Sequence, residues 1–132
     1  MKITELNKIQ DPRGNLTFLE NKNQIPFCVE RIYWIYDVPG GNERSGHAFK
    51  STTEFIIALS GSFDVKIKIN NKLSSYTLNR PNFGILLPPL TWREITNFST
   101  NSVALVLASK VFLSEDYIRD YNNYKKLINS QK

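Results

Sequence analysis

Three side chains of this sequence are candidates for acid–base or electrostatic catalysis: an imidazole, a carboxylate and a guanidinium. His47 is the only histidine in the 132 residues, Glu54 follows it closely, and Arg93 lies in a second, separate segment. A histidine can take up and release a proton near neutral pH, so it suits proton transfer at a carbon next to a carbonyl. A carboxylate beside it can orient the imidazole, act as a second acid or base, or form a buried ion pair with Arg93. The sequence leaves these roles of Glu54 open.

The spacing around His47 is that of the metal-binding strand pair of cupins, with two ligand positions changed. The motif residues are Gly41, His47, Phe49, Glu54 and Gly61. A metal-binding cupin has a second histidine where Phe49 stands and a third where Arg93 stands. Phenylalanine offers no donor atom, and arginine is a permanent cation that repels a metal ion. We therefore expect no metal and no other cofactor, and we exclude a metal-dependent dioxygenase.

Short alternating or aromatic-rich runs, separated by turn residues, predict an all-β antiparallel sandwich or barrel over about residues 1–112. Taken with the motif spacing, which resembles that of cupins, we expect a cupin jelly roll or barrel. The runs are 16–20, 30–36, 47–49, 54–59, 62–69, 74–78, 83–87, 92–95 and 103–108. Asn70 and Asn71 lie between two alternating runs and suit a tight hairpin, because asparagine tolerates a positive φ. Alternate residues of a strand face the same side, so His47 and Phe49 are expected to face the barrel interior together. If the cupin frame holds, Glu54 and Arg93 converge on the same place.

The last part of the chain predicts a C-terminal α-helix over about residues 114–129, packed on the outside of the barrel. Ser114 is a plausible N-cap, and the two acidic residues after it complement the positive end of a helix. Apolar side chains recur at helical spacing at Tyr117, Ile118, Tyr121, Tyr124, Leu127 and Ile128. No linker or repeat is visible, so residues 1–132 are interpreted as a single domain.

Composition excludes several classes of protein. The single cysteine, Cys28, cannot form an internal disulfide, and the N-terminus has no apolar stretch of signal-peptide length. We expect a cytoplasmic protein with no membrane association. The net charge of +5 indicates either a solvated basic surface or an anionic partner. The basic residues are dispersed, which favours a small phosphorylated ligand over nucleic acid.

Further candidates for ligand binding follow from residue type. Arg44, just before His47, could clamp a phosphate or be an ordinary loop arginine, and Arg31 is a second candidate for that role. Tyr33 and Trp92 could stack on a base or a sugar, although aromatic side chains are also common in a core. Phe49 would add a dry wall to the pocket.

These residues resemble those of the nucleotide-sugar 3,4-ketoisomerases, the WxcM-like group of RmlC-like cupins. The resemblance runs nearly end to end. It covers residues 11–14, 25–33, 44–48, 59–62, 88–92, 107–109 and 116–121. It implies a dimeric, metal-free cupin that binds a dTDP-linked keto-deoxysugar and moves its keto group from C4 to C3. The product would enter the synthesis of a deoxysugar for polysaccharide.

Carried over by position, His47 matches the first barrel histidine of that family and Arg44 matches the arginine before it. The family's other two histidines are Phe49 and Arg93 in this chain. A first hypothesis is therefore a 3,4-ketoisomerase or related epimerase, in which His47 moves protons with Glu54 and Arg93 in support. An alternative is a catalytically silent nucleotide-sugar-binding cupin, or the subunit partner of an active paralogue.

Overall fold

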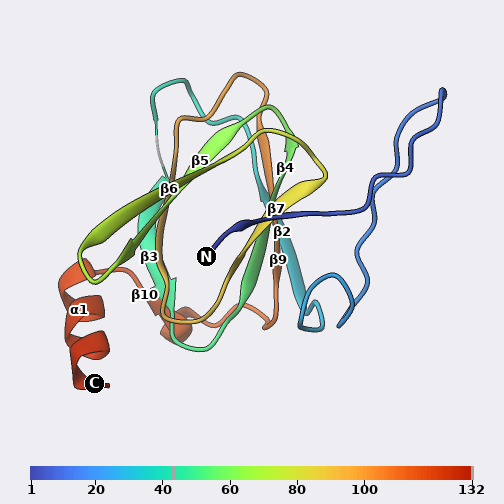
Figure 1. Cartoon of the computed structure of the whole chain (residues 1–132). Coiled ribbons are helices and arrows are strands. Elements are labelled where there is room, and N and C mark those ends of the chain that lie inside the picture. Colours follow the sequence, from blue (N-terminus) through green and yellow to red (C-terminus); the bar gives the residue numbers. More distant parts are fainter. Residues whose placement is uncertain (43, 132) are drawn as a thin grey trace.

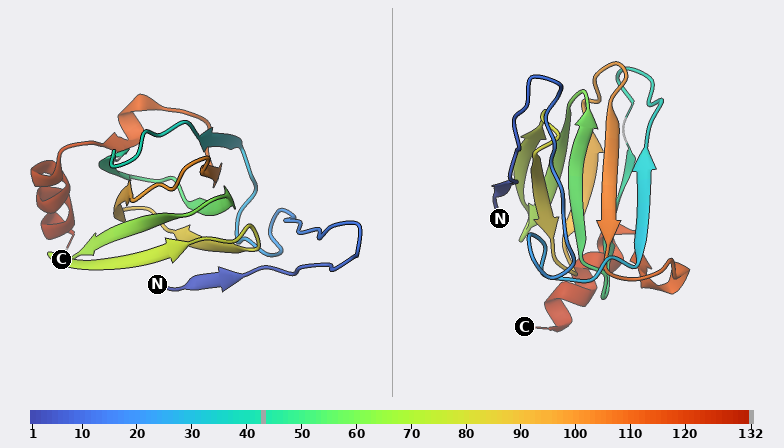
Figure 2. Two further views of the ribbon diagram at one scale, coloured as in Figure 1. Left: turned by 90° about the horizontal axis from the view of Figure 1, so that it is seen from above. Right: turned by 90° about the vertical axis from the view of Figure 1, so that its right-hand side faces the viewer.

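Two antiparallel five-stranded sheets face each other in the computed structural model, which describes residues 1–42 and 44–131 (Figures 1 and 2). The first sheet has the order β1-β7-β4-β9-β2 and the second the order β10-β3-β8-β5-β6. The strands are β1 (Ile3–Glu5), β2 (Arg31–Ile35), β3 (Arg44–Phe49), β4 (Glu54–Ser60), β5 (Phe63–Ile69), β6 (Lys72–Leu78), β7 (Phe83–Leu87), β8 (Trp92–Thr96), β9 (Val103–Ala108) and β10 (Tyr117–Ile118). The remaining elements are the 3-10 helix η1 (Ser114–Asp116) and the helix α1 (Tyr121–Ser130). The expected all-β fold with one C-terminal helix is confirmed.

The core lies between the two sheets and follows from strand alternation. In β5, Phe63, Val65 and Ile67 are fully buried, whereas the residues between them are partly exposed. Side chains from the opposite sheet, including Ile56 and Val106, complete the same apolar cluster. Burying each such side chain stabilises the fold by about 1.5–3 kcal/mol. One end of this space is polar, and the candidate site lies there.

The predicted hairpin at Asn70 and Asn71 is confirmed. Both residues have positive φ, 52° and 64°, and they connect β5 to β6. Two successive positive φ values match the right-handed twist of the flanking strands, and asparagine adopts this conformation more readily than most residues.

The predicted run 16–20 does not form a strand. Its residue Leu16 makes only an isolated bridge to Ile9, in an N-terminal arm that projects away from the two sheets (Figure 1). The arm returns through the buried residues Ile25 and Phe27, which pack on the outward face of the first sheet. Alternation alone could not show that this run lacks a neighbouring strand.

The C-terminal helix begins at Tyr121, so the predicted start near residue 114 is wrong. Asp120 is the N-cap, and its side chain accepts a hydrogen bond from the backbone N–H of Asn123 at 3.0 Å. Ser114 opens a 3-10 turn instead, and the next two residues form β10. The helix packs outside the second sheet, as expected, through Tyr124 and Leu127. Among the described residues, none of the helices has the length and apolarity that a membrane crossing requires.

Candidate active site

A cavity of about 360 Å³ opens between the two sheets at their polar end. It is lined by Tyr33, Ile35, Arg44, His47, Glu54, Ile56, Arg93, Ile95, Tyr117 and Arg119. The structure thus brings the three predicted catalytic side chains, from three separate strands, to one cavity.

Strand pairing explains why these side chains meet. His47 on β3 lies opposite Arg93 on the neighbouring strand β8, in the second sheet. Glu54 is the first residue of β4 in the facing sheet. Because side chains alternate along a strand, each of these residues points between the sheets while its chain neighbours point outward.

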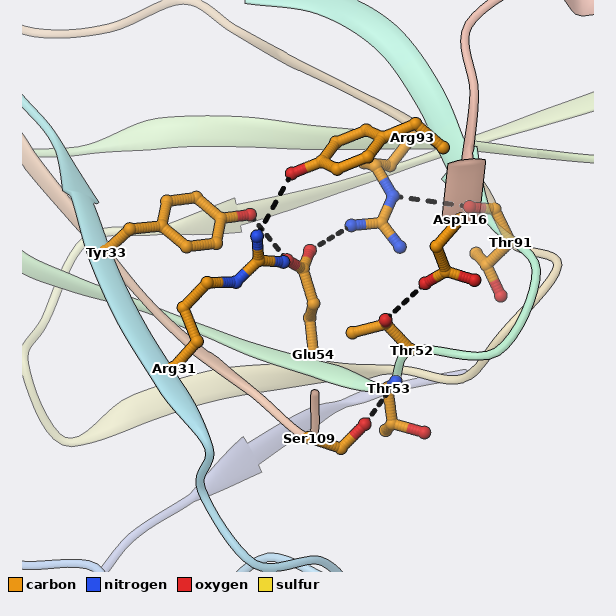
Figure 3. A network of polar contacts seen from close by, with 10 residues as sticks. Arg31, Tyr33, Thr52, Thr53, Glu54, Thr91, Arg93, Ser109 and Asp116 are labelled. Atoms are coloured by element: carbon orange, nitrogen blue, oxygen red, sulfur yellow. Dashed lines mark hydrogen bonds and ion pairs between the residues drawn. The ribbon is translucent and has the colours of Figure 1, made fainter. Parts of the chain in front are cut away.

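Glu54 and Arg93 form an ion pair that is almost fully removed from solvent (Figure 3). The Arg93 Nη1 donates to Glu54 Oε1, and the side chains are 2% and 0% exposed. The Tyr33 hydroxyl donates to the other carboxylate oxygen at 2.5 Å. The Arg93 Nε donates to the carbonyl of Thr91 at 3.3 Å, and Arg93 also lies over the ring of Phe49. Such contacts compensate for the cost of burying two charges.

Tyr33 is held as a hydrogen-bond donor by its surroundings. Burial raises the pKa of its hydroxyl well above the usual range, and the negative charge of Glu54 raises it further. The carboxylate of Glu54 accepts bonds from two donors, Arg93 and Tyr33. Of the roles that the sequence left open for Glu54, this geometry matches an ion-pair partner that fixes the guanidinium.

His47 faces the cavity against aromatic walls. Its ring meets Phe49 edge-on at 5.0 Å between centroids and lies 5.4 Å from the ring of Tyr117. The residue is partly buried and lines the cavity, while its Nε2 atom is buried. His47 is the single histidine of the sequence, and histidine is the residue type most often used for proton transfer in proteins.

Positively charged side chains gather where the cavity opens. Arg44 and Arg119 are exposed there, and the Arg119 guanidinium lies 4.2 Å from the ring of Tyr117. Arg31 is not a lining residue, but its Nη1 donates to the hydroxyl of the lining residue Tyr117 at 3.4 Å, and it lies over the rings of Tyr33 and Phe49. Since Glu54 is paired with Arg93, this opening is suited to an anionic group.

The sequence missed Tyr117 and Arg119 as lining residues. The local pattern from residue 114 resembles a helix start and predicts that Tyr117 lies on the apolar stripe of a helix. The structure instead pairs Tyr117 with Phe49, across β10 and β3. This pairing joins residues far apart in the sequence, so no local signal could have identified it.

Trp92 is not brought to the cavity, contrary to its predicted contact with the ligand. Its ring packs against Tyr121 and Tyr124 on the outward side of the second sheet, beneath α1. The physical reason is alternation, because the next residue, Arg93, points inward. Phe49 is fully buried behind His47 and Arg93 and supports both without lining the cavity.

Within residues 1–42 and 44–131, no three His, Cys, Asp or Glu side chains are grouped so that they could hold a metal ion. Residues Phe49 and Arg93, at the two altered motif positions, lie beside His47 as the spacing predicted.

The sequence was compared with protein families and with characterised relatives. The sequence model of the family described as WxcM-like, C-terminal, matches residues 1–129. The chain belongs to the WxcM-like family. A curated WxcM-like relative is the TDP-4-oxo-6-deoxy-alpha-D-glucose-3,4-oxoisomerase of Aneurinibacillus thermoaerophilus, 38% identical over 96% of this chain and 91% of the relative.

Solved structures of WxcM-like relatives agree closely with this fold. A 3,4-ketoisomerase from Helicobacter canadensis has a TM-score of 0.94 at 38% identity, covering 97% of this chain and 96% of its own. A sugar 3,4-ketoisomerase from Thermoanaerobacterium thermosaccharolyticum, solved in complex with TDP, has a TM-score of 0.95 at 35% identity. The match covers 98% of this chain and 95% of the relative's chain. A dTDP-4-dehydrorhamnose 3,5-epimerase from Bacillus anthracis is similar in fold alone. It is 15% identical, with a TM-score of 0.76 over 87% of this chain and 75% of the epimerase chain. The expected cupin jelly roll is thereby confirmed.

Proposed function

We propose that this protein is a dTDP-4-keto-6-deoxyhexose 3,4-ketoisomerase of deoxysugar biosynthesis. The observation that carries the proposal is near end-to-end similarity to a 3,4-oxoisomerase at 38% identity. The cavity supports it, because an imidazole and a buried guanidinium meet there. A histidine-to-asparagine variant of the Thermoanaerobacterium relative was solved with TDP-4-keto-6-deoxyglucose, which indicates the substrate class.

The reaction moves a carbonyl between neighbouring carbons and needs no oxidant. A base removes the proton from C3, and the electrons of that bond form a C3–C4 double bond while O4 takes up negative charge. The proton of O3 then passes to O4, the carbonyl forms at C3 as the double bond opens, and C4 receives a proton. His47 is proposed to carry the proton between carbons, since one histidine can serve both positions from one face.

The guanidinium of Arg93 is proposed to stabilise the enediolate oxygen. A fixed donor aimed at developing charge lowers the barrier most when it need not reorganise. Glu54 and the Tyr33 hydroxyl supply that rigidity, because Glu54 accepts from both Arg93 and Tyr33. Phe49 keeps water away from the imidazole on one side.

The diphosphate of the nucleotide is proposed to bind at the cavity opening, with Arg44 and Arg31 as predicted and Arg119 added. Guanidinium groups bind phosphate oxygens in bidentate geometry. Trp92 has no part in this proposal, because it lies beneath α1.

A homodimer is also proposed. The outward side of edge strand β2 exposes Ile32, Trp34 and Tyr36, each more than half exposed. Beside them, a pocket of about 520 Å³ lies between the N-terminal arm and the outward face of the first sheet, lined by apolar residues such as Phe18 and Leu105. Contiguous exposed apolar surface of this kind marks an interface, and a second copy offers the same surface. The cytoplasmic location stays a prediction from the sequence.

The direct test is to incubate the protein with TDP-4-keto-6-deoxyglucose and identify the product by NMR. A 3-keto product is expected, whereas epimerisation at a neighbouring carbon would leave the keto group at C4 and invert that carbon. Binding of TDP without any product or exchange of sugar protons would contradict the enzymatic proposal and identify a silent nucleotide-sugar-binding protein. A paired assay with a paralogue encoded nearby would then test the partner-subunit alternative.

A further inference from the structure

The segment from Ser109 to Asp116 is tied at both ends to the turn between β3 and β4. At its first end, the backbone N–H of Thr53 donates to the Ser109 hydroxyl at 2.9 Å, and the N–H of Ser109 donates to the carbonyl of Thr53 at 2.9 Å. At its second end, Asp116 binds the residues just before Thr53. The segment therefore returns to the turn that leads directly into Glu54 (Figure 3).

Asp116 makes a dense set of bonds for one side chain. Its Oδ1 accepts from the Ser51 N–H at 2.9 Å and from the Ser51 hydroxyl at 2.8 Å, and its Oδ2 accepts from the Thr52 hydroxyl. Its carbonyl accepts from the N–H of Lys50 at 2.9 Å. Thr52 is itself 1% exposed, so the anchor on the turn is rigid.

The Asp116 carboxylate stays ionised in this setting. Partial burial raises its pKa, but the hydrogen bonds from Thr52 and Ser51 outweigh that effect and leave the pKa below its ordinary value. Hydrogen bonds to a charged acceptor are stronger than those between neutral groups. The hydrogen bonds of Asp116 therefore fix residue 116 to the turn at Ser51 and Thr52.

Asp116 immediately precedes β10, which pairs with β3 through only two residues, Tyr117 and Ile118. So short a ladder is weak by itself. Tyr117 lines the cavity, contacts His47 and receives the bond from Arg31. Arg119, just after β10, lines the exposed opening. Ile118 is buried under α1 and holds the end of β10, so the start of β10, next to Tyr117, depends on the contacts of Asp116.

From this geometry we infer that Asp116 is a positioning residue for substrate binding, which holds Tyr117 and Arg119 at the cavity opening through Ser51 and Thr52. This inference rests on the proposed function for its ligand, the nucleotide diphosphate. Asp116 itself does not line the cavity, so it acts through β10. Its loss should weaken binding of the nucleotide and leave proton transfer at saturation nearly unchanged.

The test compares Asp116→Ala with the wild type by calorimetric titration of TDP and by turnover of TDP-4-keto-6-deoxyglucose. We expect the Kd for TDP and the KM to rise about tenfold, the loss expected for a charge-assisted contact, with kcat within about twofold. Hydrogen exchange should quicken at residues 117–119. Asp116→Asn keeps one acceptor oxygen for Ser51 and should restore most of the affinity.

Asp64→Ala is the matched control, because Asp64 also accepts from a threonine hydroxyl, that of Thr77 at 2.6 Å, but lies on β5 and does not line the cavity. Its Kd for TDP should equal that of the wild type. If Asp116→Ala does not fold, Thr52→Val and Ser51→Ala remove the donors one at a time, and each should raise the Kd about fivefold. Unchanged TDP binding and unchanged exchange at residues 117–119 would overturn the inference. Failure of the wild type to bind TDP would instead overturn the proposed function, and the exchange measurement would still decide whether Asp116 fixes β10.

Discussion

At the scale of single residues, the site is organised by the buried ion pair of Glu54 and Arg93. Neither charge is exposed to water, and the pair is stable because each partner compensates for the burial of the other. Tyr33 adds a donor to the carboxylate, and Phe49 covers the guanidinium. A positively charged group is thereby kept rigid beside His47.

Replacing Glu54 with glutamine should destabilise the protein by about 3–5 kcal/mol, because Arg93 would be left as a buried cation without its counter-ion. The measurement is the free energy of unfolding from urea denaturation. The double variant Glu54→Leu with Arg93→Met removes both charges and should recover much of the loss. A single variant that unfolds at the wild-type midpoint would show that the pair is open to solvent.

Tyr33 gives a prediction for alkaline pH. Burial beside Glu54 raises its pKa in the folded protein, while in the unfolded chain it titrates near its usual value of about 10. Above pH 10 the unfolded state therefore binds fewer protons than the folded state, and the free energy of unfolding falls as pH rises, by at most about 1.4 kcal/mol per pH unit. Tyr33→Phe should lack this contribution. Equal slopes of stability against pH between 10 and 11 for the two proteins would contradict the placement of Tyr33.

At the scale of secondary-structure elements, alternation along β8 separates two roles. Arg93 points between the sheets, whereas Trp92 points out and supports α1 with Tyr121 and Tyr124. The helix is thus attached to the strand that carries a site residue, without contributing to the cavity itself.

Trp92→Phe should lower the free energy of unfolding by about 1–3 kcal/mol through lost packing under α1. KM and kcat should stay within about twofold of the wild type, since the indole does not face the ligand. Measured stability and kinetics of this variant give the comparison. A large rise in KM with unchanged stability would instead restore the stacking role that the sequence suggested.

The same elements show which parts of the site and fold can be predicted from the sequence. The convergence of His47, Glu54 and Arg93 was predictable, because motif spacing and period-two alternation fix both strand and face. Alternation also contained the information that Trp92 cannot share the inward face of Arg93. The start of α1 was not predictable locally, since Ser114 and the acids after it resemble a helix start. Asp116 instead binds Ser51 and Thr52, more than sixty residues away in sequence.

At the scale of the whole molecule, the two outward faces differ. The second sheet is covered in part by α1, whereas the first leaves Ile32, Trp34 and Tyr36 exposed along β2. The N-terminal arm adds further exposed apolar residues, Ile9, Leu16 and Phe18. A monomer with this surface would be prone to associate, and the proposed symmetric dimer would cover it.

The protein should sediment at about twice its chain mass of 15.2 kDa. Trp34→Glu should shift it to the monomer, because a charge in an apolar interface is costly to bury. Leu73→Glu is the matched control, since Leu73 is similarly exposed but lies on β6 of the other sheet. A monomeric wild type, or a dimeric Trp34→Glu, would contradict pairing through β2.

The most direct test of the account follows hydrogen at the sugar carbons, in D2O, for the wild type and for His47→Asn. If His47 takes the C3 proton and exchanges it with solvent before C4 is protonated, the wild type gives a 3-keto product with deuterium at C4. His47→Asn should bind TDP as tightly as the wild type yet lose product formation and deuterium incorporation by about 10²–10⁴-fold. Wild-type rates of exchange and product formation in His47→Asn would show that another group carries the proton.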